Sequence, residues 1–252
     1  MVYKIRVIPR LDIKGPNLIK GIQLEGLRVV GAPHQFALDY YAQGADELLF
    51  MDIVASLYQR NNLTNIIRSA ADQIYIPITV GGGIRSLADV SSLMFSGADK
   101  VAINTAAIAR PALISEVSRR FGAQCMVLSV EAKRVGVGRW EAFTDSGRER
   151  TGRDVIEWVR QAADLGVGEI LLTSVDQEGM RKGFDVDLLQ QVCDAVQVPV
   201  IASGGFGQAS DLFSAAQCGV SGIAIADVLH WKRMTVPQIK QHAREQGIEV
   251  RL

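Results

Sequence analysis

Two glycine-rich stretches of this sequence have the residue types that bind phosphate. They read VGGGIRS (80–86) and SGGFGQ (203–208), and each lies between a short apolar run and an amphipathic stretch. Glycine lets the backbone approach a ligand closely, and the free N–H groups that begin a following helix attract anions. Each stretch therefore predicts either a phosphate-binding loop or only a tight turn between a strand and a helix.

The residues expected beside the two loops differ in charge. The first loop would bind phosphate through Gly82, Gly83, Asn104 and Thr105, and the second would use Gly204, Gly205, Ala226 and Asp227. Two unit charges about 4 Å apart repel by about 4 kcal/mol at an effective dielectric near 20, whereas a helix terminus returns only about 0.3–2 kcal/mol. Asp227 should therefore weaken the second site, unless it is protonated, pairs with Arg181 or Lys182, or only caps the following helix.

An internal repeat relates the two loops. Residues 44–56 resemble 166–178, residues 76–90 resemble 198–212, and residues 97–106 resemble 219–228, each pair being 122 positions apart. Self-similarity at a fixed spacing indicates repeated structural units. We expect one domain over residues 1–252, built from half-barrel repeats of about 1–122 and 123–252.

Eight short apolar runs alternate with amphipathic stretches along the chain. The expected strands are 4–12, 46–53, 75–80, 99–104, 125–131, 169–174, 198–203 and 222–226. Their continuous hydrophobicity is typical of parallel strands that are covered on both faces. Eight such units in 252 residues predict an α/β protein with the (β/α)8 TIM-barrel fold, rather than an open doubly wound sheet. In such a barrel the chemistry belongs at the C-terminal ends of the strands.

Composition restricts the possible partners. Lys plus Arg and Asp plus Glu balance at 27 each, which gives no support for nucleic-acid or acidic-membrane binding. No apolar run is long enough to span a membrane, and the three cysteines form no CxxC pair, so a reduced cytoplasmic protein is expected. His34, His230 and His242 share no metal spacing and are expected at the surface or at helix caps. We expect neither a metal nor a cofactor.

At this point a family resemblance is evident. The motifs IPRLDIK, GADEL, TVGGGIRS, GADKVAINTAA, EAKR, GEILLTS, VIASGG and the C-terminal VRL resemble the cyclase subunit of imidazole glycerol phosphate synthase, HisF, over about residues 3–252. The resemblance implies a (β/α)8 barrel that works with a glutaminase subunit. Ammonia from the glutaminase would enter at the N-terminal face and pass along the barrel axis. At the C-terminal face it would react with a bisphosphorylated ribulosyl substrate, giving imidazole glycerol phosphate and an aminoimidazole carboxamide ribotide.

The resemblance also implies roles for individual residues at the C-terminal end. Asp12 would be the general base and Glu131 the general acid, although the family carries Asp at the second position. Further substrate-binding positions would be Lys20, Ser174, Glu178 and Gly179, in addition to the two glycine loops. Glu178 and Asp227 also depart from the usual family residues. The segment 132–151 is expected to form a hairpin over the barrel mouth, as a lid or only as an insertion.

The opposite end of the barrel matches the family more closely. The positions of the family's axial ammonia gate are Arg6, Glu47, Lys100 and Glu169, and Asp99 and Gln124 match positions that face the glutaminase. Buried charges are costly unless paired, so two acids and two bases that meet there would form a ring. Four unrelated salt bridges at the rim are the alternative.

Two functions follow from this contrast. In the first, the chain is an ammonia-dependent cyclase of histidine biosynthesis. In the second, it passes ammonia to a separate amidotransferase for amidino or amino sugars of a surface polysaccharide such as O-antigen, with little chemistry of its own. Glu131 and Asp227 favour the second function, as do IPRLDIKGPNLIKGIQLEGLR and MDIVASLYQRN, which resemble that branch of the family.

Overall fold

The computed structural model describes residues 4–53 and 63–251, and it contains a closed barrel of eight parallel strands. The barrel strands are β1 (Arg6–Lys14), β4 (Leu48–Asp52), β5 (Ile78–Gly81), β6 (Lys100–Ile103), β7 (Met126–Gly136), β10 (Glu169–Ser174), β11 (Val200–Ser203) and β12 (Gly222–Ile225). Each pairs in parallel with the next, and β12 returns to pair with β1. This closure confirms the barrel prediction and excludes an open sheet.

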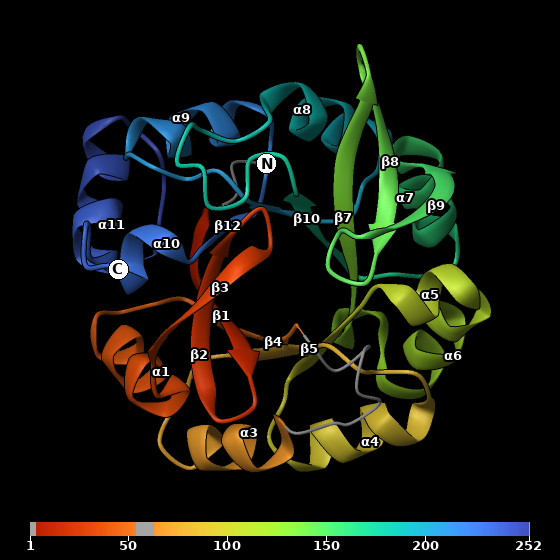
Figure 1. Ribbon diagram of the computed structural model, residues 1–252, viewed down its shortest axis with the longest axis horizontal. Coiled ribbons are helices and arrows are strands. Elements are labelled where there is room, and N and C mark those ends of the chain that lie inside the picture. Colours follow the sequence, from red (N-terminus) through yellow and green to blue (C-terminus); the bar gives the residue numbers. More distant parts are fainter. Residues whose placement is uncertain (1–3, 54–62, 252) are drawn as a thin grey trace.

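Helices form a layer around the strands (Figure 1). They are α1 (Pro33–Ala42), α3 (Leu63–Ala71), α4 (Leu87–Phe95), α5 (Thr105–Ala109), α6 (Ala112–Phe121), the short 3-10 helix η1 (Ala123–Cys125), α7 (Val155–Asp164), α8 (Val186–Ala195), α9 (Ser210–Gln217), α10 (Asp227–His230) and α11 (Val236–Glu245). Their buried apolar faces and the outward-facing strand residues form one large core. None of the described helices is long and apolar enough to cross a membrane.

A second apolar cluster fills the inside of the barrel. Successive residues of a strand point to opposite faces, so every second position of a barrel strand faces the interior. The inner cluster consists of Ile8, Leu49, Met51, Ala102, Val127, Leu171, Ile201 and Ala224. Polar and charged inward-facing positions lie before and after these residues along the strands. The barrel interior is therefore an apolar layer between two polar ends.

Two antiparallel additions follow the C-terminal ends of β1 and β7. The first is the hairpin of β2 (Asn17–Ile22) and β3 (Glu25–Gly31), with β2 also paired to β1. The second forms when β7 continues into β8 (Arg139–Thr144) and β9 (Glu149–Asp154). The expected hairpin in residues 132–151 is thus present, whereas the sequence reasoning missed the β2–β3 hairpin. The half-barrel repeat itself stays a prediction.

Candidate active site

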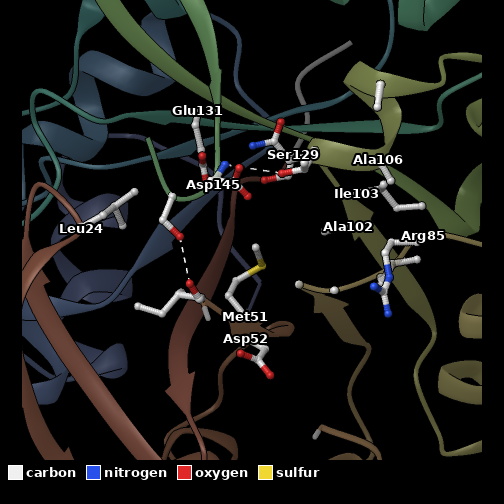
Figure 2. A pocket seen from close by; sticks show the side chains of 18 of the residues that line it. Leu24, Met51, Asp52, Arg85, Ala102, Ile103, Ala106, Ser129, Glu131 and Asp145 are labelled. Carbon is white, nitrogen blue, oxygen red and sulfur yellow. Dashed lines mark hydrogen bonds between the residues drawn. The ribbon is translucent and has the colours of Figure 1, made fainter. Parts of the chain in front are cut away.

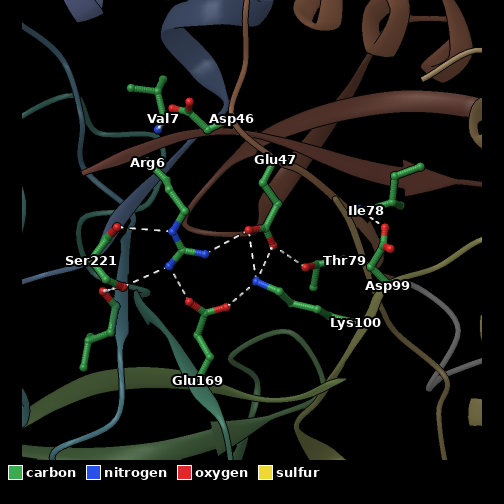
Figure 3. A network of polar contacts seen from close by, with 11 residues as sticks. Arg6, Val7, Asp46, Glu47, Ile78, Thr79, Asp99, Lys100, Glu169 and Ser221 are labelled. Atoms are coloured by element: carbon green, nitrogen blue, oxygen red, sulfur yellow. Dashed lines mark hydrogen bonds and ion pairs between the residues drawn. The ribbon is translucent and has the colours of Figure 1, made fainter. Parts of the chain in front are cut away.

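Four charged side chains form a closed ring at the N-terminal end of the barrel (Figure 3). Arg6 binds Glu47 over 2.9 Å and also pairs with Glu169, while Lys100 binds Glu47 over 3.0 Å and Glu169 over 2.8 Å. Each member starts or immediately precedes a barrel strand. Burial alone would raise the pKa of Glu169, but the charges of Arg6 and Lys100 lower it. The geometry is that of one alternating ring rather than of separate rim salt bridges. Its role as an ammonia gate stays a prediction.

The two residues expected to face a glutaminase lie in exposed positions near the starts of strands. Asp99 immediately precedes Lys100, and its carboxylate accepts a hydrogen bond of 2.8 Å from the backbone N–H of Ile78. Gln124 lies in η1, just before β7. Both are therefore on the side of the barrel that carries the charged ring, as a docking role would require.

A cavity of about 470 Å³ opens at the C-terminal end of the barrel (Figure 2). Such a volume is typical of sites for small molecules. The predicted residues that line it are Gly82, Gly83, Asn104, Thr105 and Glu131. Figure 2 also shows Met51, Asp52 and Arg85 around the cavity, together with Ser129 and Asp145. The structure thus brings the first glycine loop and one predicted catalytic carboxyl into one site.

In both loops, backbone conformation and close packing require glycine whether or not a ligand binds. Gly82 and Gly204 have φ values of +98° and +89°. A Cβ on Gly82 would lie 2.1 Å from the carbonyl oxygen of Asp52, and one on Gly204 would lie 2.6 Å from that of Ser174. Tight packing alone therefore requires glycine at these positions, and the glycine content by itself does not identify a ligand site. The adjoining cavity is the stronger argument for the first loop.

A carboxylate in the first turn of each helix after a loop binds N–H groups of that loop. The carboxylate of Asp89 accepts hydrogen bonds from the backbone N–H groups of Arg85 and Ser86, and that of Asp211 accepts from Gly207 and Gln208. These carboxylates engage N–H groups that precede α4 and α9, so the loops offer fewer free donors than the sequence suggested, whereas anion binding by the first N–H groups of the helices stays a prediction. A phosphate at the first loop could also bind through the glycine backbone and through the ends of β6 and α5.

Glu131 is the cavity's candidate acid. Its Oε2 accepts a hydrogen bond of 2.8 Å from the backbone N–H of Gly147, in the turn between β8 and β9. Burial raises the pKa of Glu131 to about 7, although the Gly147 hydrogen bond and the charge of Arg10 act in the opposite direction. Near neutral pH a large fraction of Glu131 is therefore protonated and can donate a proton.

Asp12 lies in a separate, buried group of charges that includes an arginine the sequence reasoning overlooked. Its Oδ1 accepts a hydrogen bond of 2.8 Å from Arg10, and Oδ2 lies 3.8 Å from Lys20. Lys20 in turn pairs with Glu178. Burial alone would raise the pKa of Asp12, but the charges of Arg10 and Lys20 lower it below its usual value. Asp12 is thus held as a carboxylate, in contrast to Glu131.

The alternation of inward-facing and outward-facing residues along β1 could have identified Arg10 as an interior residue. Arg6, Arg10 and Asp12 all occupy even positions of β1, the set that faces the barrel interior. Arg10 is only 3% exposed, and its Nη1 donates hydrogen bonds of 3.0 Å to Thr173 and 3.1 Å to Ser203. Its side chain thus extends across the barrel interior from β1 to β10 and β11.

The second glycine loop adjoins a hollow of only about 20 Å³. Its lining includes the predicted residues Glu178, Gly179, Gly204, Gly205, Ala226 and Asp227. The carboxylate of Asp227 lies 3.4 Å from Arg181 and 3.6 Å from Arg233. The pairing with Arg181 is one of the exceptions that the sequence argument allowed. Asp227 makes no side-chain capping hydrogen bond, so the structure does not support the helix-cap alternative.

The second loop differs from the first in the size of the adjoining space as well as in charge. Two arginines next to one carboxylate offset the repulsion that Asp227 alone would exert on an anion. The hollow of about 20 Å³ is much smaller than the cavity of about 470 Å³ beside the first loop, so it encloses less of any ligand. Close by, Ser174 is buried, and its hydroxyl has no hydrogen-bond partner within the described ranges.

Metal ligands are not gathered anywhere in the described part of the chain. Within residues 4–53 and 63–251, no group of three or more His, Cys, Asp or Glu side chains is arranged to hold a metal ion. His230 corrects a sequence expectation, because it is buried rather than exposed and lies 2.6 Å from the hydroxyl of Tyr40. Burial lowers the pKa of His230 to about 4, so this histidine is neutral near physiological pH.

Comparisons with known proteins agree with this architecture. A family profile described as "Histidine biosynthesis protein" matches residues 6–235. The chain is 64% identical over 204 residues to imidazole glycerol phosphate synthase subunit HisF of Legionella pneumophila, a match that covers 81% of this chain and 96% of that protein. This chain belongs to the HisF family. Subunits of the same name from Gluconacetobacter diazotrophicus and Mycobacterium tuberculosis are 46% and 47% identical, over 99% and 98% of this chain and 97% and 95% of those proteins.

The names of these relatives decide between the two readings of the sequence only in part. They identify the family, and they favour the histidine-pathway alternative over the surface-sugar function that the sequence motifs suggested. The surface-sugar branch gains no support from them.

Proposed function

We propose that this chain is the ammonia-using subunit of an imidazole glycerol phosphate synthase and carries out its cyclase reaction at the C-terminal end of the barrel. The supporting observation is the arrangement along the barrel. A ring of four charges lies at one end, an apolar layer fills the middle, and a cavity with Glu131 and the first glycine loop lies at the other. The high identity to subunits of that name supports the same reaction.

In this proposal a glutaminase binds at the face that carries Asp99 and Gln124. Ammonia then passes the ring of Arg6, Glu47, Lys100 and Glu169. A small neutral molecule crosses the apolar interior readily, whereas an ammonium ion would have to lose its hydration there. The ring therefore separates bulk water from an interior that favours neutral ammonia.

The two carboxyl groups take different roles because their surroundings move their pKa values apart. Glu131, protonated in part near neutral pH, donates a proton to the reacting substrate in the cavity. Asp12, held ionised by Arg10 and Lys20, is the carboxylate that can accept a proton as the general base, although its lowered pKa makes it a weaker base than an ordinary carboxylate. The phosphorylated substrate binds with one phosphate at Gly82, Gly83, Asn104 and Thr105.

The direct test supplies purified protein with an ammonium salt and the bisphosphorylated ribulosyl substrate. Formation of imidazole glycerol phosphate is expected, and Glu131→Ala should lower turnover by about 100-fold or more. Adding glutamine and the organism's own glutaminase in place of the ammonium salt should give the same product. No product from a folded protein that binds the substrate would reject the cyclase proposal.

A second candidate is delivery of ammonia to a separate amidotransferase for amidino or amino sugars. It is favoured by one specific feature, the second loop, where Asp227 adjoins a hollow much smaller than the cavity beside the first loop. The comparisons support the cyclase better. Glutaminase activation without cyclase product would favour this second candidate, especially if an aminated sugar formed when a sugar amidotransferase was added.

A further inference from the structure

Ser221 is a neighbour of the charged ring that the sequence reasoning did not single out. It directly precedes β12, is only 9% exposed, and lies on the side of Arg6 opposite to Lys100 (Figure 3). Its backbone carbonyl accepts a hydrogen bond of 3.3 Å from Nε of Arg6, and its hydroxyl accepts one of 3.0 Å from Nη2. Ser221 therefore contacts two of the three nitrogens of the guanidinium.

The acceptor atoms of Ser221 are themselves fixed by neighbouring strands. The hydroxyl donates a hydrogen bond of 3.1 Å to the backbone carbonyl of Val200, the first residue of β11, and the backbone N–H of Ser221 donates one of 2.8 Å to the same carbonyl. The carbonyl of Ser221 also accepts a hydrogen bond of 3.2 Å from the backbone N–H of Arg6. A hydroxyl has only one proton, so the bond to Val200 leaves its lone pairs for Arg6.

The ring carboxylates alone would not fix the plane of the Arg6 guanidinium. Glu47 binds Nη1 and Glu169 binds Nη2, with one hydrogen bond each. These two bonds leave the group free to rotate about the line through the two nitrogens. The contacts with Ser221 add two acceptors along the edge that contains Nε, and a planar group that is held along two edges keeps one orientation.

We propose that Ser221 is the positioning residue that holds Arg6 in the ring and so keeps the ring closed. Without the hydroxyl, Arg6 loses an acceptor, and its side chain, which is 15% exposed, can turn toward solvent. Glu47 and Glu169 would then share Lys100 alone, and the two carboxylates would repel each other. The positioning of Arg6 does not depend on the proposed function, whereas its consequence for ammonia does: an open ring lets ammonia escape to bulk water.

The first test measures the coupling between Ser221 and Arg6 in the chain alone. Urea unfolding of the wild type, Ser221→Ala, Arg6→Met and the double variant gives a double-mutant cycle. A hydrogen bond to a charged group predicts a coupling of about tenfold in the unfolding equilibrium constant. A coupling below about twofold lies within the error of additivity and would overturn the positioning role.

Crystal structures of the wild type and of Ser221→Ala give a second measurement, which needs no variant of Arg6. In Ser221→Ala the guanidinium should leave Glu169 or occupy two conformers, because one of its two acceptors on Ser221 is missing. An Arg6 side chain that keeps its contacts with both carboxylates in a single conformer would contradict the proposal. Ser221→Thr keeps the hydroxyl and should keep Arg6 in place.

The functional test measures how much product forms per glutamine hydrolysed when the glutaminase supplies the ammonia. In Ser221→Ala this ratio should fall by about twofold or more, whereas turnover with an ammonium salt should change by less than about twofold. Ser221→Thr should restore the ratio. Ser115→Ala is the matched control, because it also removes a bond from a serine hydroxyl to a backbone carbonyl, that of Leu165 at 2.9 Å, outside the ring.

The outcomes separate this inference from the cyclase proposal. An unchanged ratio in Ser221→Ala would overturn the claim that Ser221 keeps the ring closed, as would equal losses with glutamine and with the ammonium salt. If the wild type forms no cyclase product while the coupling and the displacement of Arg6 are observed, the cyclase proposal is rejected and the positioning role stands.

Discussion

The backbone N–H of Gly147 donates a hydrogen bond of 2.8 Å to the carboxylate of Glu131. Gly147 belongs to the turn between β8 and β9, and two neighbours in that turn, Asp145 and Ser146, line the cavity. The hydroxyl of Ser146 also donates to the backbone carbonyl of Ile53 over 3.0 Å. The turn between β8 and β9 therefore forms part of the cavity wall and positions its acid, whereas a role as a lid stays a prediction.

The raised pKa of Glu131 predicts a specific dependence of stability on pH. Because burial favours the neutral carboxyl, the folded protein keeps a proton that the unfolded chain has lost between about pH 4.5 and about pH 7. Stability from this group is thus greatest below about pH 4.5, declines as the pH rises to about 7, and is constant above that. Since the cavity admits water, we expect a loss of about 1–3 kcal/mol.

The measurement is urea unfolding of the wild type and of Glu131→Gln from pH 5 to pH 8. The variant keeps a neutral side chain at every pH, so the difference in unfolding free energy between the two proteins should shift in favour of the variant as the pH rises. A difference that is independent of pH would mean that Glu131 titrates normally. A proton-donating role for Glu131 near neutral pH would then have no support.

The closed ring predicts unequal effects on the two sources of ammonia. In Lys100→Met, Glu47 and Glu169 would share Arg6 alone, and the pKa of Glu169 should rise. Breaking a buried ion pair costs about 3–5 kcal/mol, and the partial exposure of this ring places the expected loss at the lower end of that range. Glutamine-driven turnover with the glutaminase should fall more than turnover driven by an ammonium salt.

His242→Gln provides the comparison, because it breaks the exposed contact with Glu245 in α11 and His242 does not line the cavity. A pair of that kind contributes about 0–1 kcal/mol, so stability should hardly change and both ammonia sources should work equally well. Equal losses with both sources in Lys100→Met would argue against an ammonia path through the ring.

The barrel was predictable because its strands are short, apolar and regularly spaced. Runs such as 169–174 and 222–226 show continuous hydrophobicity, which a parallel strand covered on both faces requires. The β2–β3 hairpin was missed for the opposite reason. Its second strand, Glu25–Gly31, is largely exposed and carries no apolar face that the sequence could reveal.

The site residues could be predicted where the residue type or a family motif identifies them, but not where their role depends on contacts in the folded barrel. The loop glycines follow from residue type and the charged ring from the family resemblance, yet the hydrogen bonds of Asp89 and Asp211 to the loops before α4 and α9 depend on local geometry. Arg10 was overlooked because residue type alone does not show that its side chain enters the barrel interior. Only the closure of the barrel places it between β10 and β11, where its charge becomes part of the site.

The last prediction concerns the unequal binding of phosphate by the two glycine loops. Phosphate should occupy the first loop before the second, because the first adjoins a much larger cavity that can enclose more of the ligand. Asp227→Ser removes the carboxylate that engages Arg181 and Arg233, and it enlarges the hollow beside Gly205. Both changes favour an anion there, and affinity for a bisphosphate should rise about tenfold, as expected for one additional charge-assisted contact.

Titration of the wild type and of Asp227→Ser with the bisphosphorylated substrate provides the measurement. Asp227→Asn is the useful companion, because it removes the charge and keeps the volume. If space limits the second loop, the asparagine variant should gain much less affinity than the serine variant, whereas equal gains would identify charge as the limit. Neither substitution should raise turnover to the same extent as affinity, because Glu131 remains one methylene longer than the aspartate that the family resemblance implies at that position. Tight binding by the wild type with no change in either variant would show that Asp227 does not restrict the second loop.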